Sequence, residues 1–264
     1  MLRQRVITAL VLAPLVLLVV FWLPHMATMA VLAALVIAAA WEWSAFPGFT
    51  QQAARLAYVA IVCLAIAAAW AFGVERAELD SVMYAAVLWW VFALVWIATA
   101  PARVNRVTAA VAGFLVLIPV WVALVRLHSR GPELMLFLLL LVVTADVGAY
   151  FAGRQFGRNK LAPRVSPGKT WEGVFGGVAA AVLMAAIGVW WLDVSAAPFL
   201  GLCIIAVVAS IIGDLTESLF KRHAGLKDSG SLLPGHGGLL DRVDSVTAAA
   251  PVFLVGLERL GLLR

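Results

Sequence analysis

The sequence has 264 residues, of which 64% are hydrophobic and only 12% are charged, and its mean hydropathy is +1.04. Soluble domains hold roughly 45–50% apolar residues, so these values exclude a soluble globular protein and indicate a membrane protein. The net charge of +5 comes from basic residues that cluster in short loops, where they set membrane topology and meet anionic headgroups. We therefore expect no nucleic-acid partner.

The apolar runs predict an all-α, polytopic integral membrane protein of about nine transmembrane helices, folded as a single membrane domain. The first run, residues 6–23, is long enough at about 1.5 Å per residue to cross a hydrocarbon core roughly 30 Å thick. A signal peptide is the alternative, but this run exceeds the roughly 7–15 residues of a signal h-region, so we predict a retained helix. The later predicted spans cover residues 26–40, 56–72, 82–98, 107–125, 134–151, 174–192, 199–220 and 241–257.

The first five predicted spans carry ionisable residues only near their ends, and their alanine-rich faces favour close helix packing rather than chemistry. The second span ends at Trp41-Glu-Trp43, aromatic residues typical of the membrane interface. Cys63 and Cys203 fall inside apolar runs without metal-ligand spacing, so we expect reduced core residues. We accordingly divide the single domain into N-terminal helices, 1–133, and a C-terminal half, 134–264, in which we expect the functional site.

The sixth span differs from the first five because it carries an acid, Asp146, near its end, with Tyr150 and Gly153 on the same helical face. An acid within a membrane span marks a functional site by default. The alternative is a structural ion pair with a loop arginine such as Arg154.

A first polar segment, residues 153–173, connects the sixth and seventh spans and contains five Lys or Arg residues but a single acid. Its Ser166-Pro-Gly-Lys-Thr170 stretch lacks the spacing of a phosphate-binding loop, and we predict no strand before it, so that interpretation fails. A phosphate contact by Lys169 remains a hypothesis. The seventh span opens with Gly173 and Gly177, whose Gly-x-x-x-Gly spacing favours close approach to a neighbouring helix.

A second polar segment, residues 218–245, lies between the eighth and ninth spans and is rich in glycine, lysine, arginine and aspartate. Its glycines let the backbone approach a ligand closely, and its mixture of charges suits a polyphosphate with metal ions. A solvated loop is the alternative. The helix ends on either side carry polar residues at offsets of three, four and seven, which place each set on one helical face: Asp214, Glu217, Ser218 and Lys221 before the loop, and Asp241, Asp244 and Ser245 after it.

Nine spans with a cytoplasmic N-terminus place 14 of the 19 Lys and Arg residues inside, as the positive-inside rule favours. Both polar segments then face the cytoplasm, where nucleotides are found. The acids near these helix ends predict a polar funnel in the cytoplasmic leaflet, because charges at that depth need a protein-walled, water-filled cavity.

The second polar segment resembles the signature of the phosphatidate cytidylyltransferase, or CDP-diacylglycerol synthase, family. The pattern Ser-x-x-Lys-Arg, Lys-Asp-x-Gly, Pro-Gly-His-Gly-Gly and Asp-Arg-x-Asp is met in full, and without departure, from Ser218 to Asp244. The Asp146 region and Ser166-Pro-Gly-Lys-Thr-Trp-Glu-Gly173 are also similar to the family, so the resemblance covers roughly the C-terminal half. It implies the reaction CTP + phosphatidate → CDP-diacylglycerol + pyrophosphate, a divalent metal such as Mg²⁺ with a second metal ion as an open alternative, the inner membrane of bacteria, and a homodimer.

Physical chemistry assigns roles within this pattern, because two anionic substrates must meet against their mutual repulsion. Carboxylates hold Mg²⁺ through one or two ligands together with substrate oxygens, and a metal pair can clamp the attacking and leaving oxygens. Our first choice of metal ligands is Asp214 and Asp241, which the resemblance also implies, followed by Asp146 and Glu217. The expected catalytic set is Asp214, Asp241, Asp228, Asp244 and Lys227, and the expected substrate-binding set is Lys169, Ser166, Ser218, Lys221, Arg222, Gly235, His236, Gly237, Gly238 and Arg242.

Two other classes of function remain open at this point. Intramembrane acids such as Asp146 and Asp214 also serve ion-coupled transporters and channels, although transporters commonly contain inverted repeats and none is visible in the sequence. A binding or scaffold protein that keeps the fold without turnover is the other class, and the intact set of acids argues against it. His236 is either an acid–base group or a hydrogen-bonding loop residue.

Overall fold

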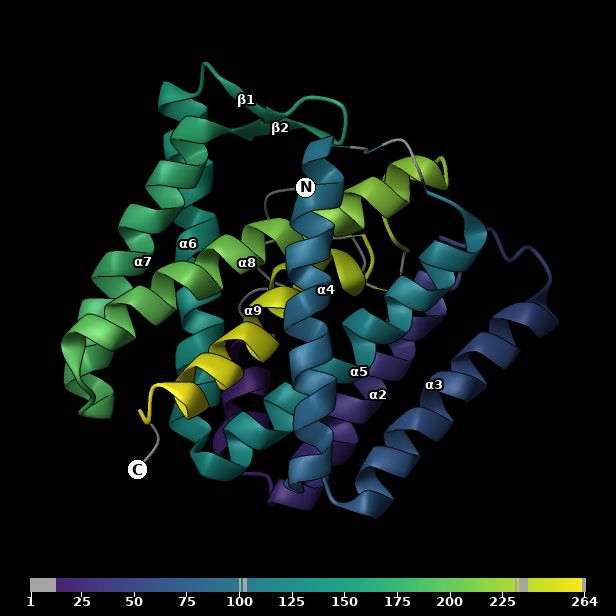
Figure 1. Ribbon diagram of the computed structural model, residues 1–264, viewed down its shortest axis with the longest axis horizontal. Helices are drawn as coiled ribbons and strands as arrows, with labels where there is room; N and C mark the ends of the chain where they lie inside the picture. The colour runs from purple at the N-terminus through teal and green to yellow at the C-terminus, as the bar shows by residue number, and fades with distance from the viewer. Residues whose placement is uncertain (1–12, 100, 102–103, 231, 233–236, 263–264) are drawn as a thin grey trace.

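The computed structural model describes residues 13–99, 101, 104–230, 232 and 237–262, and it is built almost entirely from helices (Figure 1). Residues 13–21 are helical. The helices that follow are α2 (His25–Trp43), α3 (Gln52–Phe72), η1 (Ala77–Leu79), α4 (Asp80–Thr99), α5 (Arg106–Arg130), α6 (Pro132–Phe156), α7 (Trp171–Leu192), α8 (Ala196–His223) and α9 (Leu240–Arg259).

Seven helices of the described residues are long and apolar enough to cross a membrane, namely α2 to α8, with η1 counted together with α4. The prediction of an all-α, multi-pass membrane protein is therefore confirmed at this level. Helix α9 is not among the seven, and residues 1–12 of the chain lie outside the described part, so the count of nine and the orientation of the N-terminus stay predictions.

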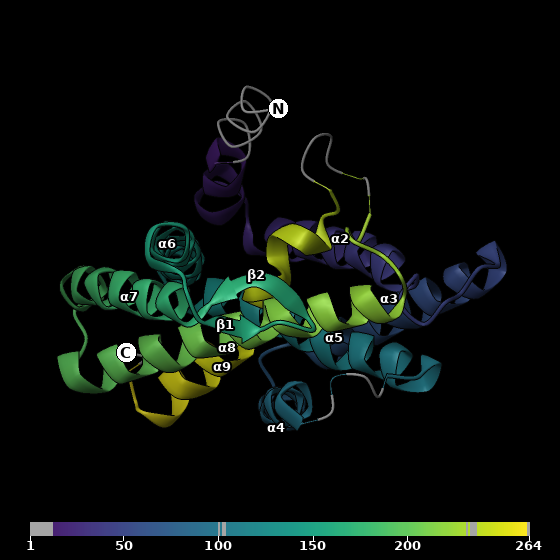
Figure 2. The ribbon, with the colours of Figure 1, turned by 90° about the horizontal axis from the view of Figure 1, so that it is seen from above.

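A short β-hairpin joins α6 to α7, and it corrects our expectation that no strand precedes Ser166. Strand β1 (Lys160–Ala162) pairs antiparallel with β2 (Ser166–Thr170), with Lys160 opposite Thr170. The Thr170 hydroxyl accepts a hydrogen bond from Gly173 N (3.2 Å) and so caps α7. The hairpin lies over α8 when the molecule is seen from above, and β2 contacts that helix (Figure 2).

Helices α6 and α7 pack side by side through glycines (Figures 1 and 2). The predicted Gly173 and Gly177 both take part, because a Cβ at either would lie 3.0 Å from a backbone oxygen of α6. A Cβ added at Gly148 would lie 2.6 Å from the Ala180 Cβ, and one at Gly176 would lie 2.2 Å from the Ala152 Cβ. These distances are too short for any side chain, so the two backbones approach as closely as glycine allows. This packing fixes the C-terminal end of α6 and the N-terminal end of α7, which the hairpin connects.

Helices α8 and α9 occupy the centre of the bundle, and α8 crosses it diagonally in Figure 1. Helix α9 contacts α4, α5, α6 and α8. A Cβ at Gly213 would lie 2.5 Å from the backbone oxygen of Asp244, so the polar ends of α8 and α9 are brought together by a close backbone contact. This contact brings Asp244 of α9 next to the turn of α8 that carries Asp214.

Trp43 is a core residue and not a residue of the membrane interface, which corrects our interpretation of the end of α2. Its side chain is 1% exposed, and its indole Nε1 donates to the Ala109 carbonyl oxygen (2.9 Å). The ring packs against Phe46 and Phe220. Because a buried indole satisfies its N–H in this way, Trp43 locks α2 against α5 and α8.

Candidate active site

A cavity of about 490 Å³ lies between α6, α7, α8 and the hairpin, and charged side chains from three of these elements line it. Asp146 comes from α6, Lys169 from β2 and Asp214 from α8. The Lys169 Nζ lies 2.7 Å from Asp214 Oδ2, so a direct ion pair joins the first polar segment to the helix that leads into the second. The rest of the lining is mainly apolar or small: Ala149, Tyr150, Gly153, Arg154, Gly168, Thr170, Gly173, Val174 and Ile211.

Asp146 does not form the structural ion pair that was its alternative explanation. Arg154 Nη1 donates instead to the Tyr150 hydroxyl (3.2 Å), and no salt bridge joins Asp146 to Arg154 in the described structure. Asp146 thus faces the cavity beside Asp214 and Lys169.

The polar face of α8 continues from Asp214 toward its C-terminal end. The Ser218 hydroxyl donates to Asp214 Oδ1 (3.3 Å), and the Lys221 Nζ lies 3.0 Å from Glu217 Oε1. The Glu217 side chain is 2% exposed, and within the described residues neither of its oxygens accepts a well-directed hydrogen bond. A buried carboxylate with this single ion pair retains unused acceptor capacity.

Asp241, in the first turn of α9, is held by contacts from three directions. Its Oδ1 accepts a hydrogen bond from Lys221 Nζ (2.6 Å), and its Oδ2 accepts from the backbone N–H groups of Ser229 (3.0 Å) and Gly238 (2.9 Å). The Lys221 ammonium and the two N–H groups all favour the charged form of the Asp241 carboxyl. Asp241 is therefore a carboxylate at neutral pH.

The other predicted residues differ in how enclosed they are, and Asp244 is partly buried. Lys227, Asp228 and Arg242 are exposed, and the Asp244 Oδ1 accepts from Ser245 N (2.7 Å). Gly237 has φ +83°, a conformation that favours glycine, and a Cβ there would lie 2.9 Å from Asp241 Oδ2. Two predicted residues, Gly235 and His236, lie outside the described residues, and Ser166 begins β2 without lining the cavity.

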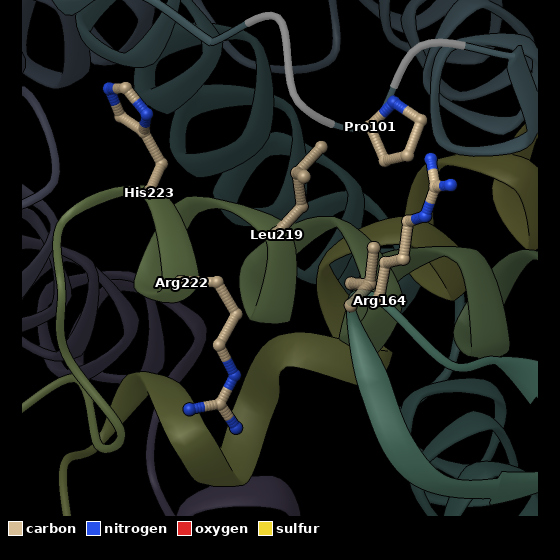
Figure 3. Close-up of a pocket in the computed structure, with 6 residues that line it drawn as sticks. Pro101, Arg164, Leu219, Arg222 and His223 are labelled. Atoms are coloured by element: carbon tan, nitrogen blue, oxygen red, sulfur yellow. The ribbon is translucent and has the colours of Figure 1, made fainter.

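A second, smaller cavity of about 230 Å³ lies beside the C-terminal end of α8, and Arg222 lines it together with Arg164, His223, Leu219, Val165 and Pro101. Figure 3 shows that the Arg222 side chain extends away from those of Arg164 and His223, so the three basic groups do not converge on one point. Arg222 thus lines a different cavity from the Lys169 and Asp214 ion pair, although the sequence pattern groups these residues together.

Glu42 is the residue near this site that the sequence analysis missed. It lies in α2, is 4% exposed, and accepts hydrogen bonds from Ser229 Oγ (3.0 Å), Leu239 N (3.0 Å) and Leu240 N (2.9 Å). The signal was present, because Glu42 is the only acid in a 19-residue apolar helix. The flanking Trp41 and Trp43 led us to assign this end of the helix to the membrane interface instead.

The donor set suits a hard cation, although no three His, Cys, Asp or Glu side chains form a ready-made metal site within the described residues. Mg²⁺ prefers oxygen ligands and usually binds through one or two carboxylates together with substrate phosphates, so it does not need a three-ligand cage. Asp146 and Asp214 share a cavity wall, and the buried oxygens of Glu217 have no well-directed hydrogen bond beyond the ion pair with Lys221. These carboxylates fit such an ion.

A family model described as the Cytidylyltransferase family matches residues 3–259. The chain belongs to this family. It is 44% identical over 277 residues to a protein of Pseudomonas aeruginosa that is named phosphatidate cytidylyltransferase, with 96% of each chain covered. A protein of the same name from Haemophilus influenzae is 37% identical over 281 residues, covering 96% of this chain and 97% of the relative. A third, from Brucella suis, is 50% identical over 135 residues, which cover 48% of this chain and 47% of that protein.

Proposed function

We propose that this protein is a phosphatidate cytidylyltransferase, which transfers CMP from CTP to phosphatidate and releases pyrophosphate. The observation that supports it best is the ion pair between Lys169 and Asp214 at the wall of a cavity. This pair joins the first polar segment to α8, the helix that leads into the second, in a member of the Cytidylyltransferase family. In this proposal both polar segments contribute to one site, as a reaction between two phosphate-bearing substrates requires.

The proposed reaction forms one bond and breaks one bond at the α-phosphorus of CTP. A phosphate oxygen of phosphatidate attacks this phosphorus, and the bond to the β-phosphate oxygen breaks, so that pyrophosphate leaves with the bonding electrons. The substrate supplies the nucleophile, so none is required from the protein. What the protein must provide is positioning and positive charge for the oxygens, which here falls to Lys169 and Lys221.

We include Mg²⁺ in the proposal, held by Asp214 and Asp241 with Asp146 and Glu217 as further oxygen ligands. When bound, the ion would neutralise phosphate charge and orient the leaving group. In the structure the ammonium groups of Lys169 and Lys221 pair with Asp214 and Asp241. If Mg²⁺ took over these two carboxylates, each lysine could turn toward a substrate phosphate. Every charged group at the site would then still have a partner of opposite charge.

The cavity wall also suits one soluble and one lipid substrate. Its charged groups are Asp146, Arg154, Lys169 and Asp214, and small or apolar residues such as Ala149 and Val174 form much of the rest of the lining. We propose that CTP enters from the cytoplasm and that the phosphatidate headgroup enters between helices while its acyl chains stay in lipid. The proposal includes a bacterial inner membrane and a homodimer, as expected for this family.

The deciding experiment uses the purified protein in detergent with phosphatidate, MgCl₂ and radiolabelled CTP. We expect equimolar release of pyrophosphate and formation of a CDP-lipid that partitions into the organic phase. The Asp214→Asn variant, purified in parallel, controls for contaminating host enzyme. Absence of a labelled lipid with the wild-type protein, at saturating CTP and over a range of Mg²⁺ concentrations, would refute the proposed function.

A further inference from the structure

Glu42 occupies an unusual position for an acid in a membrane helix, because it is buried and yet forms no ion pair with a Lys or Arg of the described structure. A buried carboxylate is costly unless hydrogen-bond donors compensate it. Its three donors all come from the second polar segment or the start of α9, between 187 and 198 residues further along the chain. The side chain therefore stabilises a particular arrangement of that distant segment.

Glu42 caps the N-terminus of α9, which has no capping side chain at its own N-cap position. This helix has Leu239 at its N-cap position and receives no hydrogen bond from an N-cap side chain of its own. Glu42 Oε1 accepts from Leu239 N, and Oε2 accepts from Leu240 N. Backbone N–H groups at a helix start lack partners within the helix, and a carboxylate is favourable there because it also faces the positive end of the helix dipole.

Glu42 and Asp241 share one set of donors. Ser229 donates its hydroxyl to Glu42 and its backbone N–H to Asp241, and Gly238 N donates to Asp241 while the next two N–H groups donate to Glu42. The chain around Ser229 and Gly238 is thus held between two carboxylates. A displacement of one carboxylate moves the donors of the other, and Asp241 in turn holds Lys221.

The Glu42 side chain occupies space that a side chain at Gly230 or Gly238, two glycines of the signature, would need. A Cβ at Gly230 would lie 2.4 Å from Glu42 Oε1, and a Cβ at Gly238 would lie 2.6 Å from Glu42 Oε2. Gly230 has no positive φ, so its backbone alone does not require glycine. The requirement at position 230 comes from the carboxylate of α2, since all three of the nearest atoms belong to Glu42.

We infer that Glu42 is a positioning residue for the reaction, which holds the start of α9 so that Asp241 and Lys221 are correctly placed. The inference rests on the proposed function for its catalytic consequence. It also gives the N-terminal helices a role in the active site, because the residue that orients the second polar segment belongs to α2.

The kinetic test compares Glu42→Gln and Glu42→Ala with the wild-type protein. Loss of a partner that orients a metal-binding side chain typically costs about 10–100-fold, so we expect Glu42→Ala to lower kcat by at least about tenfold, with a smaller change in KM for CTP and phosphatidate. Glu42→Gln keeps one carbonyl oxygen and should retain more activity than Glu42→Ala. Wild-type kcat in Glu42→Ala would overturn the inference.

A matched control separates positioning from stability. Asp80→Asn removes a carboxylate that pairs with the buried Arg126 far from the site. We expect it to lower the thermal midpoint but to leave kcat per folded molecule unchanged. If Glu42→Ala likewise lost stability alone, with an unchanged kcat per folded molecule, Glu42 would be only a structural residue and the inference would fail.

A double-mutant cycle tests the contact itself. Gly230→Ala should lower kcat by about tenfold in the wild-type background, because the new Cβ collides with Glu42. In the Glu42→Ala background the same change should cost less than about twofold, since the colliding atoms are gone. Losses that simply multiply would show that the two residues act independently and would contradict the inference.

Hydrogen exchange provides a measurement that does not depend on the reaction. The backbone amides of Leu239 and Leu240 should exchange faster in Glu42→Ala than in the wild-type protein, because their acceptors are lost. Unchanged exchange would refute the contact even in an active enzyme. A wild-type protein that shows the protected amides but forms no CDP-lipid would instead refute the proposed function and leave the contact standing.

Discussion

Two polar clusters lie at opposite ends of α9, and they differ in how completely their hydrogen-bonding groups are matched. At the Glu258 end, the Arg126 guanidinium, 1% exposed, donates to the Val74 oxygen (2.8 Å), to Asp80 Oδ1 (2.6 Å) and to the Arg76 oxygen (2.8 Å). Glu258 pairs with Arg130 at the same end. Every nitrogen of the buried guanidinium has at least one hydrogen-bond partner, and we call the cluster saturated in this sense.

At the Asp241 end, some 17 residues or about 26 Å away along the helix, the groups are not saturated. Asp214 and Lys169 pair at the wall of an open cavity, and both oxygens of Glu217 lack a well-directed hydrogen bond. The comparison teaches that charge within a membrane protein is not by itself evidence of function. The site differs from the saturated cluster, which holds helix ends together, in two ways: it has an ion pair at a cavity wall, and a nearby buried carboxylate, Glu217, lacks a well-directed hydrogen bond.

The largest effect should come from Asp214→Asn, which is nearly isosteric but removes the charge that faces the cavity. Turnover should fall more than about 100-fold, because loss of even an outer-shell partner of a metal costs about 10–100-fold. The measurement is the rate of CDP-lipid formation by protein purified as a folded species. Glu258→Gln, at the saturated end, is the control and should change the rate less than about threefold. Near-normal turnover in Asp214→Asn would remove this residue from the proposed metal site.

Lys169→Ala should have the next largest effect, because it removes the cation that links the hairpin to α8. We expect kcat/KM for CTP or phosphatidate to fall about tenfold, the magnitude of one hydrogen bond to a charged group. Expression and membrane insertion should not change. Lys160→Ala, exposed at the base of the same hairpin, controls for loss of positive charge alone. If the kinetics for both substrates stayed normal in Lys169→Ala, the two polar segments would not share a site.

A smaller effect, of a different kind, is expected at the saturated end. Asp80→Asn weakens the ion pair of Arg126, and hydrogen bonds to charged groups contribute roughly 1.5–3 kcal/mol to stability, less where the partner is partly exposed, as Asp80 is. The thermal midpoint in detergent should therefore drop by several degrees while kcat stays within about twofold of the wild type. A large loss of kcat without loss of stability would break the distinction between the two ends.

The last experiment perturbs the protein least, and it tests whether the two polar segments face the cytoplasm. In a background without Cys63 and Cys203, single cysteines are placed at Arg158 and Leu232, both exposed and one in each polar segment. The positive-inside distribution predicts that neither reacts with an impermeant thiol reagent in intact cells, and that both react after permeabilisation. Ser229 is unsuitable for this purpose because it is buried and hydrogen-bonded. Labelling from outside would reverse the proposed orientation.

The sequence predicted most helices well because long apolar runs dominate it. The predicted spans 56–72, 82–98 and 174–192 fall within or coincide with α3, α4 and the greater part of α7. The offsets between Glu217 and Lys221 also predicted that one face of α8 turns inward, and the structure places both side chains in the interior. Periodicity is local information, so these features required no knowledge of the tertiary fold.

Features that depend on contacts between distant segments could not be predicted in this way. The β-hairpin has strands of only three and five residues and is held in place by α6 and α7. Strands this short show no periodic sequence pattern from which they could be predicted. The hydrogen bonds of Glu42 to the start of α9, and the burial of Trp43, depend on how α2 packs against α5 and α8. A sequence pattern identifies an acid in a helix but not the donor that lies opposite it.

The glycine contact between α6 and α7 has a consequence for how this protein can diversify. With no room for a Cβ at Gly148 or Gly176, substitution cannot change the spacing of the two helices that form one side of the cavity without separating them. The width of the cavity can instead be altered at the larger lining side chains, Tyr150, Val174 and Ile211. Variants selected to accept a bulkier or slimmer lipid should therefore accumulate changes at these three positions while the glycines stay fixed.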